Sequence, residues 1–178
     1  MGNPTLAILS VSAGAGHVRA AEAIKTYAEQ YYPDMNSVHI DLMTLVPPLF
    51  KKMYADSYIQ IVEKHPNLWG YLYRKSDSQK VTSPLNRLRR AIERLNTGKF
   101  DETLDDLNPD YVVCTHFLPA ELLSKMKKEK RFSPPVWVQV TDFDIHTMWV
   151  HPFLDGYFAA SEEVSWRMAD REIGRAHV

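Results

Sequence analysis

Short apolar runs alternate along this chain with segments of helical periodicity, and this alternation constrains the fold more than any other feature. Each run is too short for a buried helix and is typical of a strand buried on both faces. The runs lie at Thr5–Val11, Ser37–Leu42, Tyr111–Thr115, Val136–Val140 and Tyr157–Ala160. Strands that alternate with helices predict an α/β fold with a parallel sheet and helices on both of its faces.

Apolar and small side chains recur at helical spacing after the first run, so a helix is expected from about His17 to the residue before Pro33. These side chains are Val18, Ala21, Ile24 and Ala28. The same reasoning predicts helices near residues 49–64, 68–75, 84–95, 100–107, 120–129 and 162–169. Residues 46–99 have the least regular pattern of the chain.

Size and composition exclude several classes of protein. A chain of 178 residues with 45% hydrophobic residues can form one domain with a real core. A net charge of -1 argues against a general nucleic-acid binder, which usually carries a strong basic excess. The single cysteine, Cys114, lies in an apolar run and is expected to be a buried, reduced thiol, which fits the cytosol. No run approaches the ~20 apolar residues of a spanning helix, so any membrane contact should be peripheral.

The last residues do not read like part of a domain. Glu172–Val178 resembles the in-frame translation of a common sequencing adapter. We therefore expect residues 1–171 to be the native domain and residues 172–178 to be a non-native extension.

Three polar loops follow predicted strands, at Ser12–His17, Thr115–Pro119 and Thr141–Pro152. Strands of one parallel sheet point the same way, so the three loops should meet at one edge of the sheet. Ligands of such folds bind at the carboxyl ends of the strands. A candidate site is therefore expected where these loops converge.

The first loop contains Gly14 and Gly16 directly before a helix. Glycines let a ligand approach the backbone, and free N–H groups at a helix N-terminus favour phosphate or carboxylate. The loop matches neither the dinucleotide nor the kinase-type phosphate motif, and a tight turn that needs glycine for its geometry remains an alternative. The helix dipole should keep His17 neutral, so that it can accept a proton from a hydroxyl; a histidine that caps or packs is the plainer interpretation.

The third loop is dense in polar and aromatic side chains. Metal-ligand types occur at Asp142, Asp144, His146 and His151, but their spacing matches no compact metal motif, so no metal is expected. An exposed Trp149 beside histidines would suit an interface or a lipid headgroup region. In the alternative, Trp149 and Phe143 simply cover the sheet edge.

Residues 74–99 carry eight basic side chains against two acidic ones. The predicted helix 84–95 combines an apolar stripe with Arg87, Arg90 and Arg94, a pattern that can lie on an anionic membrane. An aromatic-rich stretch precedes it, at Tyr54, Tyr58, Trp69, Tyr71 and Tyr73. A solvated helix face over a core of tyrosines would give the same pattern.

Together these residues resemble the monogalactosyldiacylglycerol synthase family and its bacterial relatives, the processive diacylglycerol glucosyltransferases. The resemblance spans nearly all of residues 5–170, although Ala15 replaces the middle one of three glycines that often precede the histidine. It rests on Ile8–His17, Ala20–Ile24, Asp41, Cys114–Phe117, Val140–Asp144, His146, Trp149, His151 and Asp155–Ser161.

The resemblance implies the N-terminal half of a GT-B glycosyltransferase, a Rossmann-like domain that binds the lipid acceptor, with the UDP-sugar held by an absent C-terminal domain. It implies inverting transfer of glucose or galactose to diacylglycerol, with UDP-sugar as co-substrate and no metal or other cofactor. His17, or less favourably Asp142, would be the general base. Partners would be diacylglycerol and an anionic membrane, with a peripheral location on the cytoplasmic face of the cell membrane. The acceptor or phosphate loop would comprise Gly14, Gly16, Thr115, His116 and Phe117; lipid contacts would come from His146, Trp149, His151, Arg87, Arg90 and Arg94.

Two alternatives stay open from the sequence. A lipid-linked glycosyltransferase of peptidoglycan synthesis would share the glycine-rich loop and the histidine. A non-catalytic module that binds lipid or phosphate would need no donor domain at all. The third loop and the aromatic stretch favour the diacylglycerol family.

Overall fold

The computed structural model describes residues 2–54, 97–142, 147–169 and 176–177. The chain forms two compact units. One unit combines Met1–Leu42 with Glu102–Val178, and the other is Met43–Asp101. The first unit contains the parallel sheet and all three polar loops.

The sheet of the first unit is parallel throughout and has the strand order β2-β1-β3-β4-β5-β6. The strands are β1 (Thr5–Ser10), β2 (Asn36–Asp41), β3 (Tyr111–Cys114), β4 (Val136–Gln139), β5 (Gly156–Phe158) and β6 (Ala176–His177). The predicted α/β class and the five predicted strands are confirmed, each to within two residues at either end. The assignment of residues 172–178 as non-native stays a prediction.

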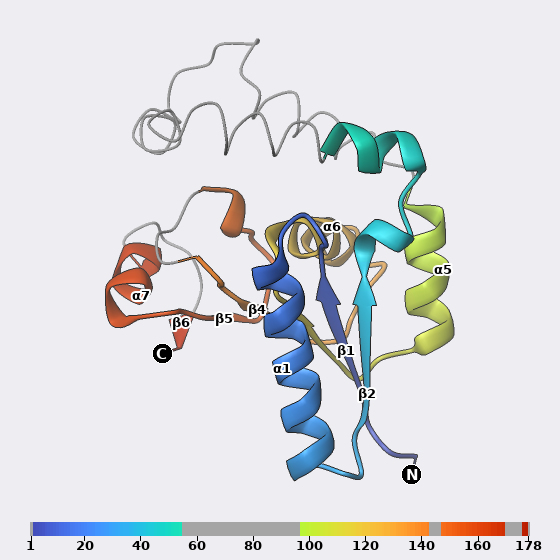
Figure 1. The fold of residues 1–178 in the computed structure, drawn as a ribbon, viewed down its shortest axis with the longest axis horizontal. Helices are drawn as coiled ribbons and strands as arrows, with labels where there is room; N and C mark the ends of the chain where they lie inside the picture. Colours follow the sequence, from blue (N-terminus) through green and yellow to red (C-terminus); the bar gives the residue numbers. More distant parts are fainter. Residues whose placement is uncertain (1, 55–96, 143–146, 170–175, 178) are drawn as a thin grey trace. The chain divides into compact units, whose positions relative to one another are not determined.

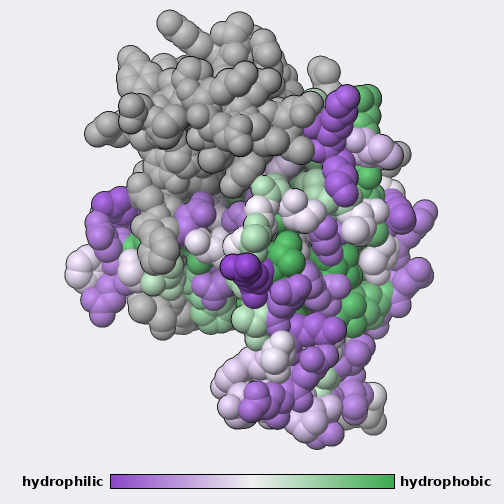
Figure 2. Space-filling model, viewed as in Figure 1, coloured by the Kyte–Doolittle hydropathy of each residue, from purple (hydrophilic) through white to green (hydrophobic). Residues whose placement is uncertain are grey.

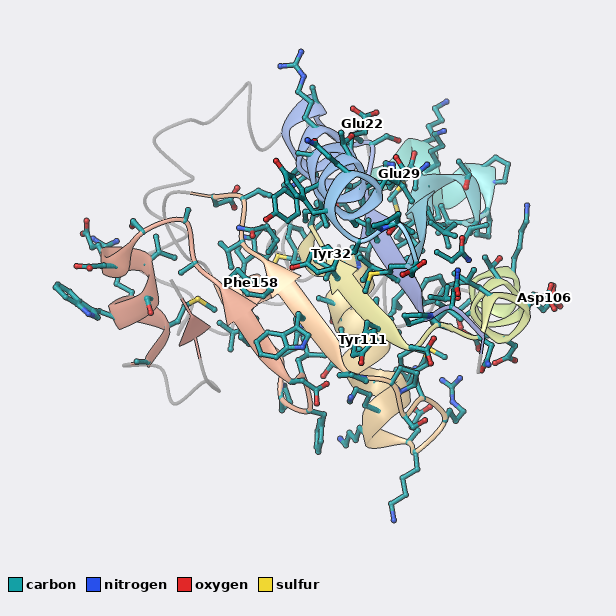
Figure 3. The ribbon with its side chains drawn as sticks, turned by 90° about the horizontal axis from the view of Figure 1, so that it is seen from below. Glu22, Glu29, Tyr32, Asp106, Tyr111 and Phe158 are labelled. Atoms are coloured by element: carbon teal, nitrogen blue, oxygen red, sulfur yellow. The ribbon has the colours of Figure 1, made fainter. Side chains whose placement is uncertain are left out.

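Helices lie on both faces of the sheet (Figure 1). Helix α1 (Ala15–Tyr31) packs on β1 and β2, and α6 (Phe117–Lys128) packs on β3 and β4. The chain crosses the sheet in opposite directions at these two connections, so right-handed crossovers place the two helices on opposite faces. Glu22 and Glu29 extend from the side of α1 that is turned away from the sheet (Figure 3). The described residues also include α5 (Gly98–Leu107), α7 (Glu162–Ala169) and the 3-10 turns η1 (Leu42–Thr44) and η2 (Thr147–Trp149).

The beginning of α6 differs from the sequence prediction. The helix begins at Phe117, three residues before the predicted start at residue 120. His116 adopts extended backbone geometry and its Nδ1 accepts the N–H of Leu118 at 3.0 Å, which caps the helix. A histidine is an uncommon helix cap, so the pattern of preferred caps did not predict this start.

The core of the first unit is the middle of the sheet and the apolar side of its helices. Ile8, Val112, Cys114 and Val138 have no exposed surface. Each fully buried aliphatic side chain contributes about 1.5–3 kcal/mol relative to exposure. The predicted burial of the thiol is confirmed, and burial raises the pKa of Cys114. The lower part of the surface in Figure 2, where α1 ends, is mostly hydrophilic.

Strand β5 begins with a glycine for a steric reason. The ring of Trp137 on β4 lies so close that a Cβ on Gly156 would come within 2.3 Å of it. The indole also stacks on Phe158, with ring centroids 5.3 Å apart. The glycine therefore lets an aromatic pair lie across neighbouring strands.

Of the second unit, residues 43–54 and 97–101 are described. Residues 48–54 are helical and bury Phe50 and Tyr54, whose ring centroids are 5.9 Å apart. The rest of the predicted helix 49–64, and the predicted helices 68–75 and 84–95, lie outside the described residues. Among the described helices, none combines the length and the apolar character needed to cross a membrane.

Candidate functional site

The three polar loops meet at the carboxyl edge of the sheet, as the sequence predicted. His17, in the first turn of α1, brings its Nδ1 to 3.0 Å from the carbonyl oxygen of Thr115, which follows β3. The same Nδ1 lies 2.8 Å from Oγ1 of Thr141, which follows β4. These contacts join residues 98 and 124 positions apart in the chain. One imidazole therefore connects the ends of three strands.

Thr115 binds His17 from two directions. Its hydroxyl donates to the carbonyl oxygen of His17 at 2.9 Å, while its own carbonyl oxygen faces the imidazole. Its N–H donates to the carbonyl oxygen of Leu9 at 2.9 Å, which ties it to the end of β1. Thr115 is fully buried and His17 is half-buried. The backbone and the ring of His17 are thus both held in place.

A cluster of aromatic rings lies beside His17. We call it the aromatic wall, and it consists of His116, Phe117 and Trp149. The ring centroid of His116 is 4.5 Å from that of His17, with the rings nearly perpendicular, and Trp149 is 6.3 Å away. His116 and Trp149 have no exposed surface, and Phe117 is 9% exposed. Edge-to-face rings at such distances stabilise one another.

The expectation of an exposed Trp149 is wrong. The indole is fully buried because it packs edge-on against Phe117, with centroids 5.8 Å apart, and near His116. Thr115 and His116 are also fully buried, and the carbonyl oxygen of Thr115 and the ring of His116 lie against His17. Their assignment to an acceptor or phosphate loop stays a prediction. These residues support the imidazole from behind.

Asp142 is connected to this cluster through the tryptophan. The indole N–H of Trp149 donates to Oδ2 of Asp142 at 2.8 Å. A buried indole needs a hydrogen-bond partner, and the carboxylate supplies a strong one. The half-buried Asp142 therefore lies beside the same aromatic wall as His17. The sequence predicted that both residues would gather here, but not that the tryptophan connects them.

The first loop is held by the end of the neighbouring strand. Oδ1 of Asp41, at the end of β2, accepts the N–H of Ser12 at 3.1 Å. Oγ of Ser10, at the end of β1, lies 2.7 Å from Nε2 of His39. The family resemblance includes Ser10, Ser12, Asp41 and Thr141, but sequence reasoning named none of them, nor His39, as a site residue, although a polar residue at a strand end was a usable signal.

Gly14 and Gly16 occupy different positions in this loop. Gly14 precedes α1 in ordinary extended geometry, and no side chain caps the helix there. Gly16 is exposed, and a Cβ built on it would meet no atom within 4 Å. Neither packing nor a left-handed backbone requires a glycine at position 16.

The far end of the third loop is attached to the sheet and to α6. The hydroxyl of Tyr157 on β5 donates to the carbonyl oxygen of His151 and accepts its N–H, both at 2.9 Å. The hydroxyl of Ser124 on α6 donates to the carbonyl oxygen of Pro152. The pKa of Tyr157 is raised to about 12, chiefly by burial of its hydroxyl. The hydrogen bond with the backbone of His151 lowers this pKa, and the nearby Cys114 raises it.

Tyr157 is expected to make stability depend on alkaline pH. Its pKa is higher in the folded chain than the usual 10, so its contribution is complete below about pH 10 and is lost between pH 10 and 12. The difference in unfolding free energy between the wild type and Tyr157→Phe should therefore shrink by roughly 2–3 kcal/mol over this range. Urea unfolding at several pH values measures it. A difference in unfolding free energy that stays constant with pH would contradict the prediction. The titration of the other tyrosines cancels from this difference because both proteins contain them.

Several predicted residues lie outside the described part of the chain: Asp144, His146, Arg87, Arg90 and Arg94. His151 is half-buried and its backbone is held by Tyr157, so a lipid contact of its side chain stays a prediction. Within the described ranges, no three His, Cys, Asp or Glu side chains gather as a metal site would require.

The chain was compared with known proteins. The profile of the monogalactosyldiacylglycerol (MGDG) synthase family matches residues 17–178. Proteins named processive diacylglycerol beta-glucosyltransferase from Bacillus cereus strain B4264 and Bacillus mycoides strain KBAB4 are each 30% identical over 173 residues. The corresponding protein of Bacillus thuringiensis strain Al Hakam is 28% identical. These alignments cover 94% of this chain and 42% of each relative, so the chain spans less than half of their length.

No solved structure matches the chain significantly. The family assignment therefore rests on the profile and on the curated relatives, and the profile match includes His17, the Thr115 loop and the Thr141 loop. From this match over most of its length, the chain belongs to the monogalactosyldiacylglycerol synthase family.

Proposed function

We propose that this chain is the acceptor-side part of a glycosyltransferase that moves a hexose from a UDP-sugar to a hydroxyl of diacylglycerol, with inversion. The observation that carries the proposal is the half-buried imidazole of His17, held by the ends of three strands at the edge where such sheets bind ligands. Family membership supports the reaction class. The names of the relatives favour diacylglycerol as acceptor and glucose as the sugar.

His17 is the general base of the proposed reaction. As the acceptor oxygen attacks the anomeric carbon, its proton passes to the imidazole, and the bond from that carbon to the UDP oxygen breaks. UDP leaves with the electron pair, so a single displacement inverts the anomeric centre. No covalent intermediate forms and no atom changes oxidation state, so one base suffices and UDP-sugar is the sole co-substrate. Asp142 is the weaker candidate because one of its oxygens accepts the indole N–H.

The glycine at position 16 is a further argument that a ligand binds at the first loop. A glycine in a helix costs up to roughly 0.5–1 kcal/mol relative to alanine, the value for a helix interior. Neither steric contact nor backbone geometry explains this cost here. Close approach of a ligand to the loop would explain it, and the N-terminus of α1 would favour an anionic group such as a phosphate.

The proposed location follows from the acceptor. Diacylglycerol is held in a bilayer, so the acceptor must be reached at a membrane surface. We place the protein peripherally on the cytoplasmic face, where anionic lipids would be its partners. The UDP-sugar would bind to a further domain, because the relatives are more than twice as long as the aligned part.

An acceptor assay with the full-length protein tests the proposal. UDP-glucose and UDP-galactose, each radiolabelled, are offered with vesicles that contain either diacylglycerol or the undecaprenyl-linked peptidoglycan intermediate. We expect labelled glycolipid with diacylglycerol alone. Transfer to the polyprenyl lipid would contradict the acceptor assignment, and vesicle binding without any transfer would favour a non-catalytic module. The 178-residue chain alone should transfer no sugar.

A further inference from the structure

We propose that Thr141 is a positioning residue that, together with the backbone carbonyl of Thr115, holds His17 in one tautomer and so determines which ring nitrogen acts as the base. The inference deepens the proposed function, since it rests on His17 as the proton acceptor. The Thr141 hydroxyl and the Thr115 carbonyl oxygen both face Nδ1, at 2.8 and 3.0 Å. In the resulting tautomer Nδ1 carries the proton and Nε2 is the basic nitrogen.

The tautomer follows from the chemistry of the two partners. A carbonyl oxygen can accept a hydrogen bond and cannot donate one. At 3.0 Å it therefore favours a proton on Nδ1, because an unprotonated Nδ1 would set its lone pair against those of the oxygen. The hydroxyl of Thr141 would then be a second acceptor of the same N–H. If Thr141 instead donated its hydroxyl proton to an unprotonated Nδ1, the contact with Thr141 would be satisfied but the contact with the Thr115 carbonyl oxygen would be repulsive.

The two acceptors contact the imidazole from the ends of two different strands. Thr115 follows β3 and Thr141 follows β4, and these strands are neighbours in the sheet. The hydroxyl of Thr115 is already directed at the carbonyl oxygen of His17, so only its backbone orients the ring. The Thr141 hydroxyl is the side-chain group that completes the orientation.

The role of Thr141 resembles that of the carboxylate in a Ser-His-Asp triad, which holds its histidine in the correct tautomer and orientation. Here both groups on Nδ1 are uncharged. A ring of the aromatic wall also packs on the imidazole: the centroid of His116 lies 4.5 Å from that of His17, with the two rings nearly perpendicular. The imidazole is therefore restrained in rotation as well as in protonation.

Nitrogen NMR of the histidine rings tests the inference directly. The protein is labelled with nitrogen-15 at its histidine rings, and the His17 signals are identified by their loss in His17→Asn. We expect the wild type to show His17 with the proton on Nδ1. Thr141→Ser retains the hydroxyl and should keep this tautomer. Thr141→Val has the same shape but removes one of the two acceptors at Nδ1, so the tautomer with the proton on Nε2 should rise to a measurable share.

Turnover of the full-length protein provides the second readout. Thr141→Val should lower kcat about tenfold with little change in KM, the effect of one lost orienting hydrogen bond, and Thr141→Ser should restore it. A wild-type His17 with its proton on Nε2 would overturn the inference, even if Thr141→Val does not fold. An unchanged tautomer in Thr141→Val would overturn it as well. A tautomer shift without any loss of turnover would instead refute the assignment of His17 as base.

Discussion

Replacement of His17 by alanine is expected to lower the turnover of the full-length protein by about 100-fold or more, because general base catalysis contributes factors of this size. The methyl group cannot accept the proton of the acceptor hydroxyl. Initial rates with diacylglycerol vesicles and saturating UDP-sugar measure the loss. The sheet should stay intact, because the half-buried ring contributes little core volume beside the buried aromatic wall.

His17→Asn distinguishes a base from a merely structural residue. The asparagine amide can place an N–H near the position of Nδ1 and so keep the bond to the Thr115 carbonyl oxygen. It has no basic nitrogen. If His17 is the base, the asparagine variant should be as slow as the alanine variant while unfolding at the wild-type temperature. Near-normal turnover in His17→Asn would remove His17 from the catalytic role.

The second large effect concerns stability. Trp149→Ala should lower the unfolding free energy by about 3–5 kcal/mol, since the fully buried indole fills the space between the third loop and α6. The variant also removes the donor to Asp142, which adds to the cost. Urea unfolding followed by circular dichroism measures the change.

Two tryptophan variants serve as controls for this prediction. Trp166 on α7 is 66% exposed, so Trp166→Ala should change stability by less than about 0.5 kcal/mol. Trp149→Phe keeps an aromatic ring against Phe117 and loses the bond to Asp142, so an intermediate loss is expected. If Trp149→Ala unfolds within 1 kcal/mol of the wild type, roughly the cost of an average substitution, the indole does not fill this position.

The site was predictable in part. Gly14, Gly16 and His17 stand out because glycines and a histidine at a strand-to-helix turn are a local signal. Asp142 stands out because it follows a predicted strand at the same sheet edge. Trp149 was misjudged because the burial of a loop tryptophan depends on which rings it meets, here His116 and Phe117, more than thirty residues earlier in the chain.

Amino-acid pattern alone determined that this chain forms a parallel α/β sheet and that its polar loops share one edge. Strand and helix periodicities are local properties, and parallel strands place all their carboxyl ends together. Only the tertiary structure decided which atoms meet there: a carbonyl oxygen 98 residues away and a hydroxyl 124 residues away on one imidazole nitrogen. Such contacts depend on strand order and side-chain packing, which no local stretch of sequence contains.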